Sequence, residues 1–136
     1  MAKVVIIKIL QILFLGLSLA NIANAGEVTL VAADFRTVDN RLWDIQVTLQ
    51  HADTGWDHYA DRWRVVDSNG QVLANRVLYH PHVDEQPFTR GLSGISLPST
   101  GKLYIEAHDN VHGWAKQRLT VKLRQTIKGH LRITSD

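Results

Sequence analysis

The chain contains no cysteine, only one methionine and only three prolines. Without cysteine it can form neither a disulfide bond nor a thiolate metal site, and no cysteine is present that could carry a lipid. The single methionine is Met1, so a copper(I) site built from thioether sulfur is excluded as well. Stability must therefore come from packing, to which the four tryptophans contribute: Trp43, Trp56, Trp63 and Trp114.

An apolar leader occupies residues 1–25. It has Lys3 near its start, an apolar run that reaches Ile22, and the small-residue ending Ala23-Asn24-Ala25. This combination predicts a secretory signal peptide, whose removal leaves a mature protein that begins at Gly26 and resides in the periplasm or outside the cell. A membrane-spanning segment is the alternative, although Lys8 interrupts the apolar run.

The mature part carries no excess of either charge. Two of the 15 Lys and Arg residues, Lys3 and Lys8, lie in the leader, so 13 remain against 13 Asp and Glu. The whole-chain isoelectric point of about 9.1 therefore gives no evidence for nucleic acid or an anionic membrane as a partner. Removing 25 of the 136 residues leaves 111, a length that suits one domain.

Apolar and polar residues alternate along most of the mature chain. In RLWDIQVTLQ, residues 41–50, every second residue from Trp43 to Leu49 is apolar, as in a half-buried strand. The same pattern predicts seven strands, at 28–35, 41–50, 59–67, 71–79, 87–97, 102–108 and 117–123.

Seven short strands separated by turns predict an all-β fold. We expect a seven-stranded antiparallel β-sandwich of the immunoglobulin or fibronectin type III kind over residues 26–123. A basic tail at 124–136 should lie loosely outside it. The expected core includes Trp43, Ile45, Val47, Leu49, Trp63, Val65, Leu103 and Ile105.

Successive connections in an antiparallel sandwich alternate between its two ends. The connections after the second, fourth and sixth predicted strands therefore share one end, and they contain HADTGWDH, HPHVDEQ and, just beyond His108, DNVHGW. This parity gathers six histidines at that end: His51, His58, His80, His82, His108 and His112.

Imidazole nitrogens from three neighbouring loops are suited to a divalent transition metal. We expect the six histidines to bind zinc or copper(II), since sulfur ligands are absent from the mature chain. The carboxylates expected to complete the shell or orient the rings are Asp53, Asp57, Asp84, Glu85 and Asp109. A mature chain that begins Gly26-Glu27-Val28 has no histidine at its first or third position, which excludes a histidine brace and an amino-terminal copper clip.

Two other interpretations stay open. The histidine, aspartate and tryptophan loops equally suit a structural network in which Trp56 and Trp114 cover the end of the core and the polar side chains bond to the loop backbone. The same loops also suit recognition of a periplasmic protein partner or a carbohydrate. The candidates for such a surface are Trp56, Tyr59, Tyr79, Phe88 and Arg90.

Catalytic function ranks behind these three. The chain has no Gly-x-Ser-x-Gly elbow, no HExxH helix, no phosphate loop and no cysteine nucleophile. A metal-hydroxide hydrolase would need an open position at the expected metal site.

Three sequence blocks carry a family resemblance. TGWDHYADRWRVVD, HPHVDEQPFTRGLSGI and AHDNVHGW resemble the blocks on which a family of small exported bacterial proteins is built, over most of residues 43–123. The resemblance implies export and a shared fold, and it implies no activity.

Overall fold

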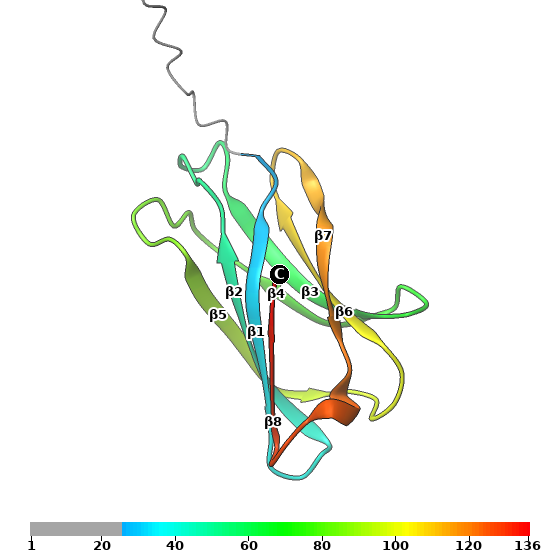
Figure 1. Cartoon of the computed structure of the whole chain (residues 1–136). Helices are drawn as coiled ribbons and strands as arrows, with labels where there is room; N and C mark the ends of the chain where they lie inside the picture. The colour runs from blue at the N-terminus through cyan, green and yellow to red at the C-terminus, as the bar shows by residue number, and fades with distance from the viewer. Residues whose placement is uncertain (1–25) are drawn as a thin grey trace, which may run out of the picture.

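A computed structural model describes residues 26–136, and the predicted leader lies outside the described residues. The described chain forms two four-stranded sheets, in the orders β5-β2-β1-β8 and β4-β3-β6-β7 (Figure 1). Every strand pair is antiparallel. The elements are β1 (Thr29–Thr37), β2 (Leu42–Gln50), β3 (Ala60–Asp67), β4 (Val72–Val77), β5 (Phe88–Ser96), β6 (Leu103–Asp109), β7 (Gly113–Val121), the 3-10 turn η1 (Leu123–Gln125) and β8 (His130–Thr134).

The alternation of apolar residues places the core between the sheets. In β2, Trp43, Ile45, Val47 and Leu49 are buried while their neighbours in sequence face outward. Side chains from both sheets join one buried cluster. All eight residues that the sequence assigns to the core are buried, which confirms that part of the prediction.

The predicted count of seven strands is wrong, because the described chain has eight. Strand β8 pairs with β1 over the positions from Ala32–Thr134 to Arg36–His130. Two of its residues, Leu131 and Ile133, pack against the core. The segment predicted as a loose basic tail thus supplies an edge strand. Its alternation spans only five residues, too few to stand out among the basic residues around it.

The antiparallel order brings three connections to one end of the molecule. The connections β2–β3 (51–59), β4–β5 (78–87) and β6–β7 (110–112) lie together at the top of Figure 1, beside the start of β1. The β1–β2 and β5–β6 connections lie at the opposite end with η1. We call the end formed by residues 51–59, 78–87 and 110–112 the histidine pole.

The turn before β8 depends on a glycine. Gly129 has φ of 73°, its carbonyl accepts the Thr37 N–H at 2.9 Å, and a Cβ atom on it would overlap the Thr37 carbonyl oxygen. We expect Gly129→Ala to lower the free energy of unfolding by about 3 kcal/mol in urea titrations, because φ strain and backbone overlap add. Gly101→Ala is the matched control: Gly101 has φ of 87° but open space around its Cβ, so it should lose about 1 kcal/mol. Equal losses of stability in the two variants would contradict the conclusion that the turn before β8 depends on the close contact between Gly129 and Thr37.

Candidate functional site

Asp109, the last residue of β6, is the buried centre of a polar cluster at the histidine pole. Its side chain is 0% exposed. The backbone N–H groups of Val111 and His112 donate to its Oδ1 at 2.9 and 2.7 Å, which closes the β6–β7 turn. The same oxygen accepts from His58 Nε2 at 2.9 Å and from His112 Nδ1 at 3.2 Å. Its Oδ2 is buried without a hydrogen-bond partner among residues 26–136.

These donors keep Asp109 ionised. Burial alone would raise the pKa of this carboxyl group, but the N–H groups of His112 and Val111 and the His58 ring outweigh burial and lower the pKa below its usual value. Asp109 is therefore a buried anion at neutral pH. Such an anion is stable only where donors or cations surround it.

Asp53 is a second buried carboxylate at the same pole. Its Oδ1 accepts the Ala60 N–H at 2.9 Å and His51 Nδ1 at 2.5 Å, and its Oδ2 accepts the His82 N–H at 2.8 Å. Gln86 reinforces this link, since it accepts the His51 N–H and donates to the His82 carbonyl, both at 3.0 Å. Asp53 and Gln86 together fasten the β2–β3 connection to the β4–β5 connection.

The ring of His51 lies between two acceptors. Nδ1 contacts the Asp53 carboxylate, and Nε2 lies 3.0 Å from the carbonyl oxygen of Gly26. A neutral imidazole has a single N–H and can donate only one of these two hydrogen bonds. A ring protonated on both nitrogens satisfies both acceptors, and a metal ion bound to Nε2 could take the place of one of these protons.

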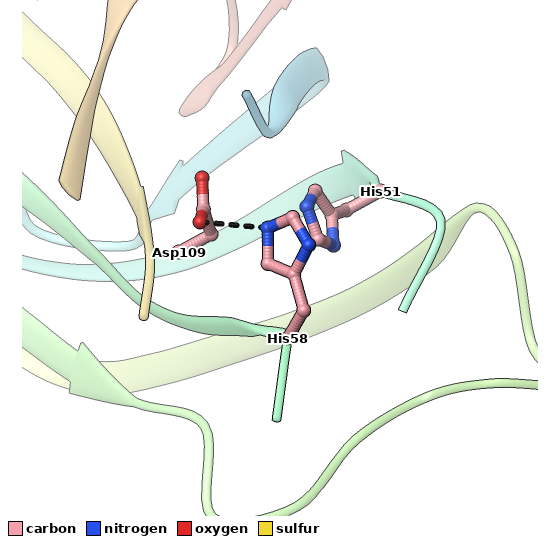
Figure 2. Close-up of side chains that lie close together, drawn as sticks. All are labelled: His51, His58 and Asp109. Carbon is pink, nitrogen blue, oxygen red and sulfur yellow. Dashed lines mark hydrogen bonds and ion pairs between the residues drawn. The ribbon is translucent and has the colours of Figure 1, made fainter. Parts of the chain in front are cut away.

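His51, His58 and Asp109 form the potential metal-binding group of the described chain. One ligand atom from each lies within 4.8 Å of the other two (Figure 2). The rings of His51 and His58 meet edge to face at 4.7 Å, and the His112 ring is 4.9 Å from His58. Imidazole nitrogen and carboxylate oxygen are ligands that zinc accepts. The contact between Asp53 and His51 Nδ1 is the kind that orients a metal-binding imidazole from behind.

His80 and His82 form a separate pair on the β4–β5 connection. Their rings are 4.6 Å apart, and His82 is buried in a parallel stack on Phe88 with centroids 4.0 Å apart. Neither nitrogen of His82 has a hydrogen-bond partner in the described part of the chain. Burial, followed by the charges of Arg90 and His80, lowers the pKa of His82. His82 thus packs as a neutral aromatic ring, and its backbone alone reaches Asp53.

His108 does not join the Asp109 group, contrary to expectation. Strand β6 extends to Asp109, so alternation turns Ala107 and Asp109 inward and His108 outward. There His108 donates to Asp61 and lies against Trp114. Of the six predicted histidines, the structure thus brings His51, His58 and His112 together near Asp109 and places His80, His82 and His108 apart from them.

Three of the predicted supporting carboxylates also stay outside that group. Asp57 and Asp84 are exposed, and Glu85 pairs with Arg90 at 3.0 Å. Of the five carboxylates named from the sequence, Asp53 and Asp109 are the two that contact the clustered histidines.

Asn110 joins two connections of the histidine pole, and it was not identified from the sequence. Its Oδ1 accepts the Tyr59 N–H at 2.8 Å, and its Nδ2 donates to the Trp56 carbonyl at 3.0 Å. The β6–β7 turn is thereby tied to the β2–β3 connection. An amide beside Asp109 in a short turn was the available signal, but its partners lie more than 50 residues away in sequence.

The proposed recognition residues divide by burial. Trp56 and Tyr79 are 65% and 75% exposed, so Trp56 does not cover the core as the structural interpretation expects. Tyr59 packs edge to face on Trp56, with ring centroids 5.6 Å apart. Phe88 is buried beneath His82, and Arg90 is held by Glu85.

The comparisons with known proteins give one match. The chain is 39% identical over 100 residues to a protein of Halomicrobium mukohataei called "Putative lipoprotein". This stretch is 73% of the present chain and 46% of the other, so the chain spans less than half the length of that relative. No family model and no solved structure match. Within residues 26–136, no helix is long and apolar enough to cross a membrane.

Asp53→Asn tests the first of the two buried carboxylates. The amide group turns one acceptor oxygen into a donor that faces either the His82 N–H or the groups at Oδ1. We expect a loss of about 1–3 kcal/mol in the free energy of unfolding, measured in urea. Asp57→Asn, on the same connection but exposed, should stay within about 0.5 kcal/mol of the wild type. An unchanged free energy of unfolding in Asp53→Asn would contradict the conclusion that Asp53 holds the β2–β3 and β4–β5 connections together.

The lowered pKa of His82 predicts a pH effect on stability. On acidification the unfolded chain takes up this proton first, near its ordinary pKa of 6.5, so stability is complete above that value and declines as pH falls through the lower folded pKa. His82→Phe, which retains the ring stack, should reduce the slope of melting temperature between about pH 7.5 and about pH 5. Tyr79→Phe, which changes an exposed ring on the same connection, is the control and should leave the slope unchanged. An unchanged slope in His82→Phe would contradict this assignment.

Proposed function

We propose that this domain binds a divalent transition metal, zinc or copper(II), through His51, His58 and Asp109, with His112 as the fourth ligand. The main support for this proposal is that one ligand atom from each of His51, His58 and Asp109 lies within 4.8 Å of the other two. Zinc–nitrogen distances are about 2.0–2.1 Å, so two nitrogens on one ion lie at most about 4.2 Å apart. Ligation therefore needs side-chain movements of less than about 1 Å.

The electrostatics of the cluster also support a cation. His51 Nε2 and the Gly26 oxygen lie 3.0 Å apart, so a metal ion bound to both would take the place of a proton on Nε2. Asp109 is ionised and wholly buried, so a nearby cation lowers the cost of burying its charge. Asp53 meanwhile holds the outer nitrogen of His51, which leaves Nε2 for the ion.

Export is part of the proposal. The predicted signal peptide and the likeness to a protein called a putative lipoprotein support a place outside the cytoplasm, with the periplasm as the compartment. The role of the domain would be to deliver or sequester the metal.

We also assign the two sheets to an immunoglobulin-like or fibronectin type III-like sandwich. The order β5-β2-β1 against β4-β3-β6-β7 supports this type, with β8 added at the β1 edge.

A structural network is the second candidate. It is favoured by the observation that His51, His58 and His112 each contact a carboxylate within the protein itself. Such contacts fasten loops without any ion. A third candidate, recognition of a periplasmic protein, is favoured by the exposed rings of Trp56 and Tyr79.

Calorimetric titration with zinc and with copper(II) separates the candidates. We expect stoichiometric binding by the mature domain, abolished in His58→Gln because one of the four proposed ligands is lost. His108→Gln is the matched control: that histidine also contacts an aspartate near the pole but lies outside the group. If the wild type binds neither metal while His58→Gln is destabilised, the cluster is a structural network. If both variants lose binding equally, the assigned ligands are wrong.

A further inference from the structure

We infer that the α-amino group of Gly26, set free when the leader is removed after Ala25, is a further ligand of the His51–His58–Asp109 metal site. The inference rests on the proposed metal binding. It adds that the site becomes complete only on export, because the precursor lacks one ligand. A metal would then load after translocation rather than before it.

The contacts of the first mature residues hold Gly26 at the site. Its carbonyl oxygen lies 3.0 Å from Nε2 of His51. The next residue, Glu27, accepts the backbone N–H of Lys116 in β7 at 3.0 Å. At Leu30 the backbone N–H donates to Gln117 Oε1 at 2.8 Å, and the carbonyl accepts from Gln117 Nε2 at 3.0 Å.

These hydrogen bonds determine where the first residues of the mature chain lie in the fold. Strand β7 follows the turn that Asp109 and His112 close, so a segment bonded along β7 starts beside that turn. Figure 1 shows the start of β1 and the β6–β7 connection at the same end of the molecule. Gly26 itself is thus held by its contact with His51, and three hydrogen bonds from Glu27 and Leu30 to β7 position the residues that follow it.

Cleavage changes the chemistry of the Gly26 nitrogen. In the precursor this nitrogen belongs to the Ala25–Gly26 amide, whose lone pair is delocalised into the carbonyl group. Hydrolysis adds one water: the carboxylate stays on the leader and a primary amine on Gly26. The neutral amine has a lone pair for a metal ion. Its nitrogen and the carbonyl oxygen of the same residue close a five-membered ring around that ion.

The position of the carbonyl oxygen makes this chelation geometrically direct. An ion held by the Gly26 amine and carbonyl lies next to His51 Nε2, since that oxygen already contacts the ring nitrogen. Gly26 is exposed, and no atom lies within 4 Å of the point where a Cβ would be. An ion in solution can therefore reach this residue.

The arrangement differs from the amino-terminal metal motifs that the sequence excludes. Those motifs need a histidine at the first or third mature position, and this chain has glycine and valine there. Here the imidazole comes from His51, 25 residues further along the chain, and the fold brings the two together. The lack of an amino-terminal histidine therefore does not prevent the amine from binding.

The test compares a protein whose amino terminus is Gly26 with a protein in which extra residues precede Gly26. The full chain is expressed with its leader, recovered from the periplasm, and its start at Gly26 is verified by mass spectrometry. The comparison protein carries Ser-Gly-Ser-Gly between the cleavage site and Gly26, so every native residue remains but the Gly26 nitrogen is again an amide. Zinc and copper(II) affinities are measured for both by calorimetry, and unfolding in urea without metal verifies equal stability.

We expect the extended protein to bind metal about 10- to 100-fold more weakly, since even the loss of a group that merely supports a ligand costs this much. Gly26→Gln, cyclised to pyroglutamate, should show the same loss because it has no amine. Equal affinity in all three proteins would overturn the amine as a ligand and leave the proposed metal site intact. No binding by any of them would overturn the metal site itself.

Discussion

Two carboxylates that no solvent reaches, Asp53 and Asp109, determine how the histidine pole is built. A buried carboxylate is tolerated only where donors or cations surround it. Asp53 meets this need with an imidazole and two backbone N–H groups, and Asp109 with two imidazoles and two backbone N–H groups. Their donors come from all three connections of the pole, so satisfying the two charges folds the loops against one another.

The need to surround a buried carboxylate with donors or cations also bears on the proposed metal binding. Oδ1 of Asp109 receives four donors and its Oδ2 receives none from residues 26–136. His51 faces two acceptors with a ring that has one proton in its neutral form. His51 therefore has an acceptor beside each ring nitrogen, and the acceptor left over is satisfied by a second ring proton or, under our proposal, by a metal ion at Nε2. The structural and metal-binding interpretations differ in which of these cations completes it.

Much of the fold follows from local patterns in the sequence. The alternation from Trp43 to Leu49 gives β2 and its buried face, and the antiparallel order assigns His51, His58 and His112 to connections at one end. The alternation in β8 is too short to be distinguished from a basic tail, because Leu131 and Ile133 are its two apolar residues. Pairing with β1, a contact nearly 100 residues away in sequence, stabilises that strand.

The membership of the site was harder to predict than its location. The predicted strand ends at 108 and leaves Asp109 in the loop, whereas β6 extends to Asp109, so that the alternation turns the aspartate inward and His108 outward. The stack of His82 on Phe88 and the contact of Gly26 with His51 arise from tertiary packing. Residue spacing does not indicate either contact. The sequence therefore predicts that the histidines lie at one end of the fold, but it does not predict which of them lie next to one another.

The most direct test of the account is the anomalous diffraction of a crystal of the mature domain grown with zinc, measured at the zinc absorption edge. The account predicts one anomalous peak about 2.0–2.2 Å from ligand atoms of His51, His58 and Asp109. A peak at His80 and His82 instead, or no ordered peak while His51 keeps its 3.0 Å contact with the Gly26 oxygen, would contradict it.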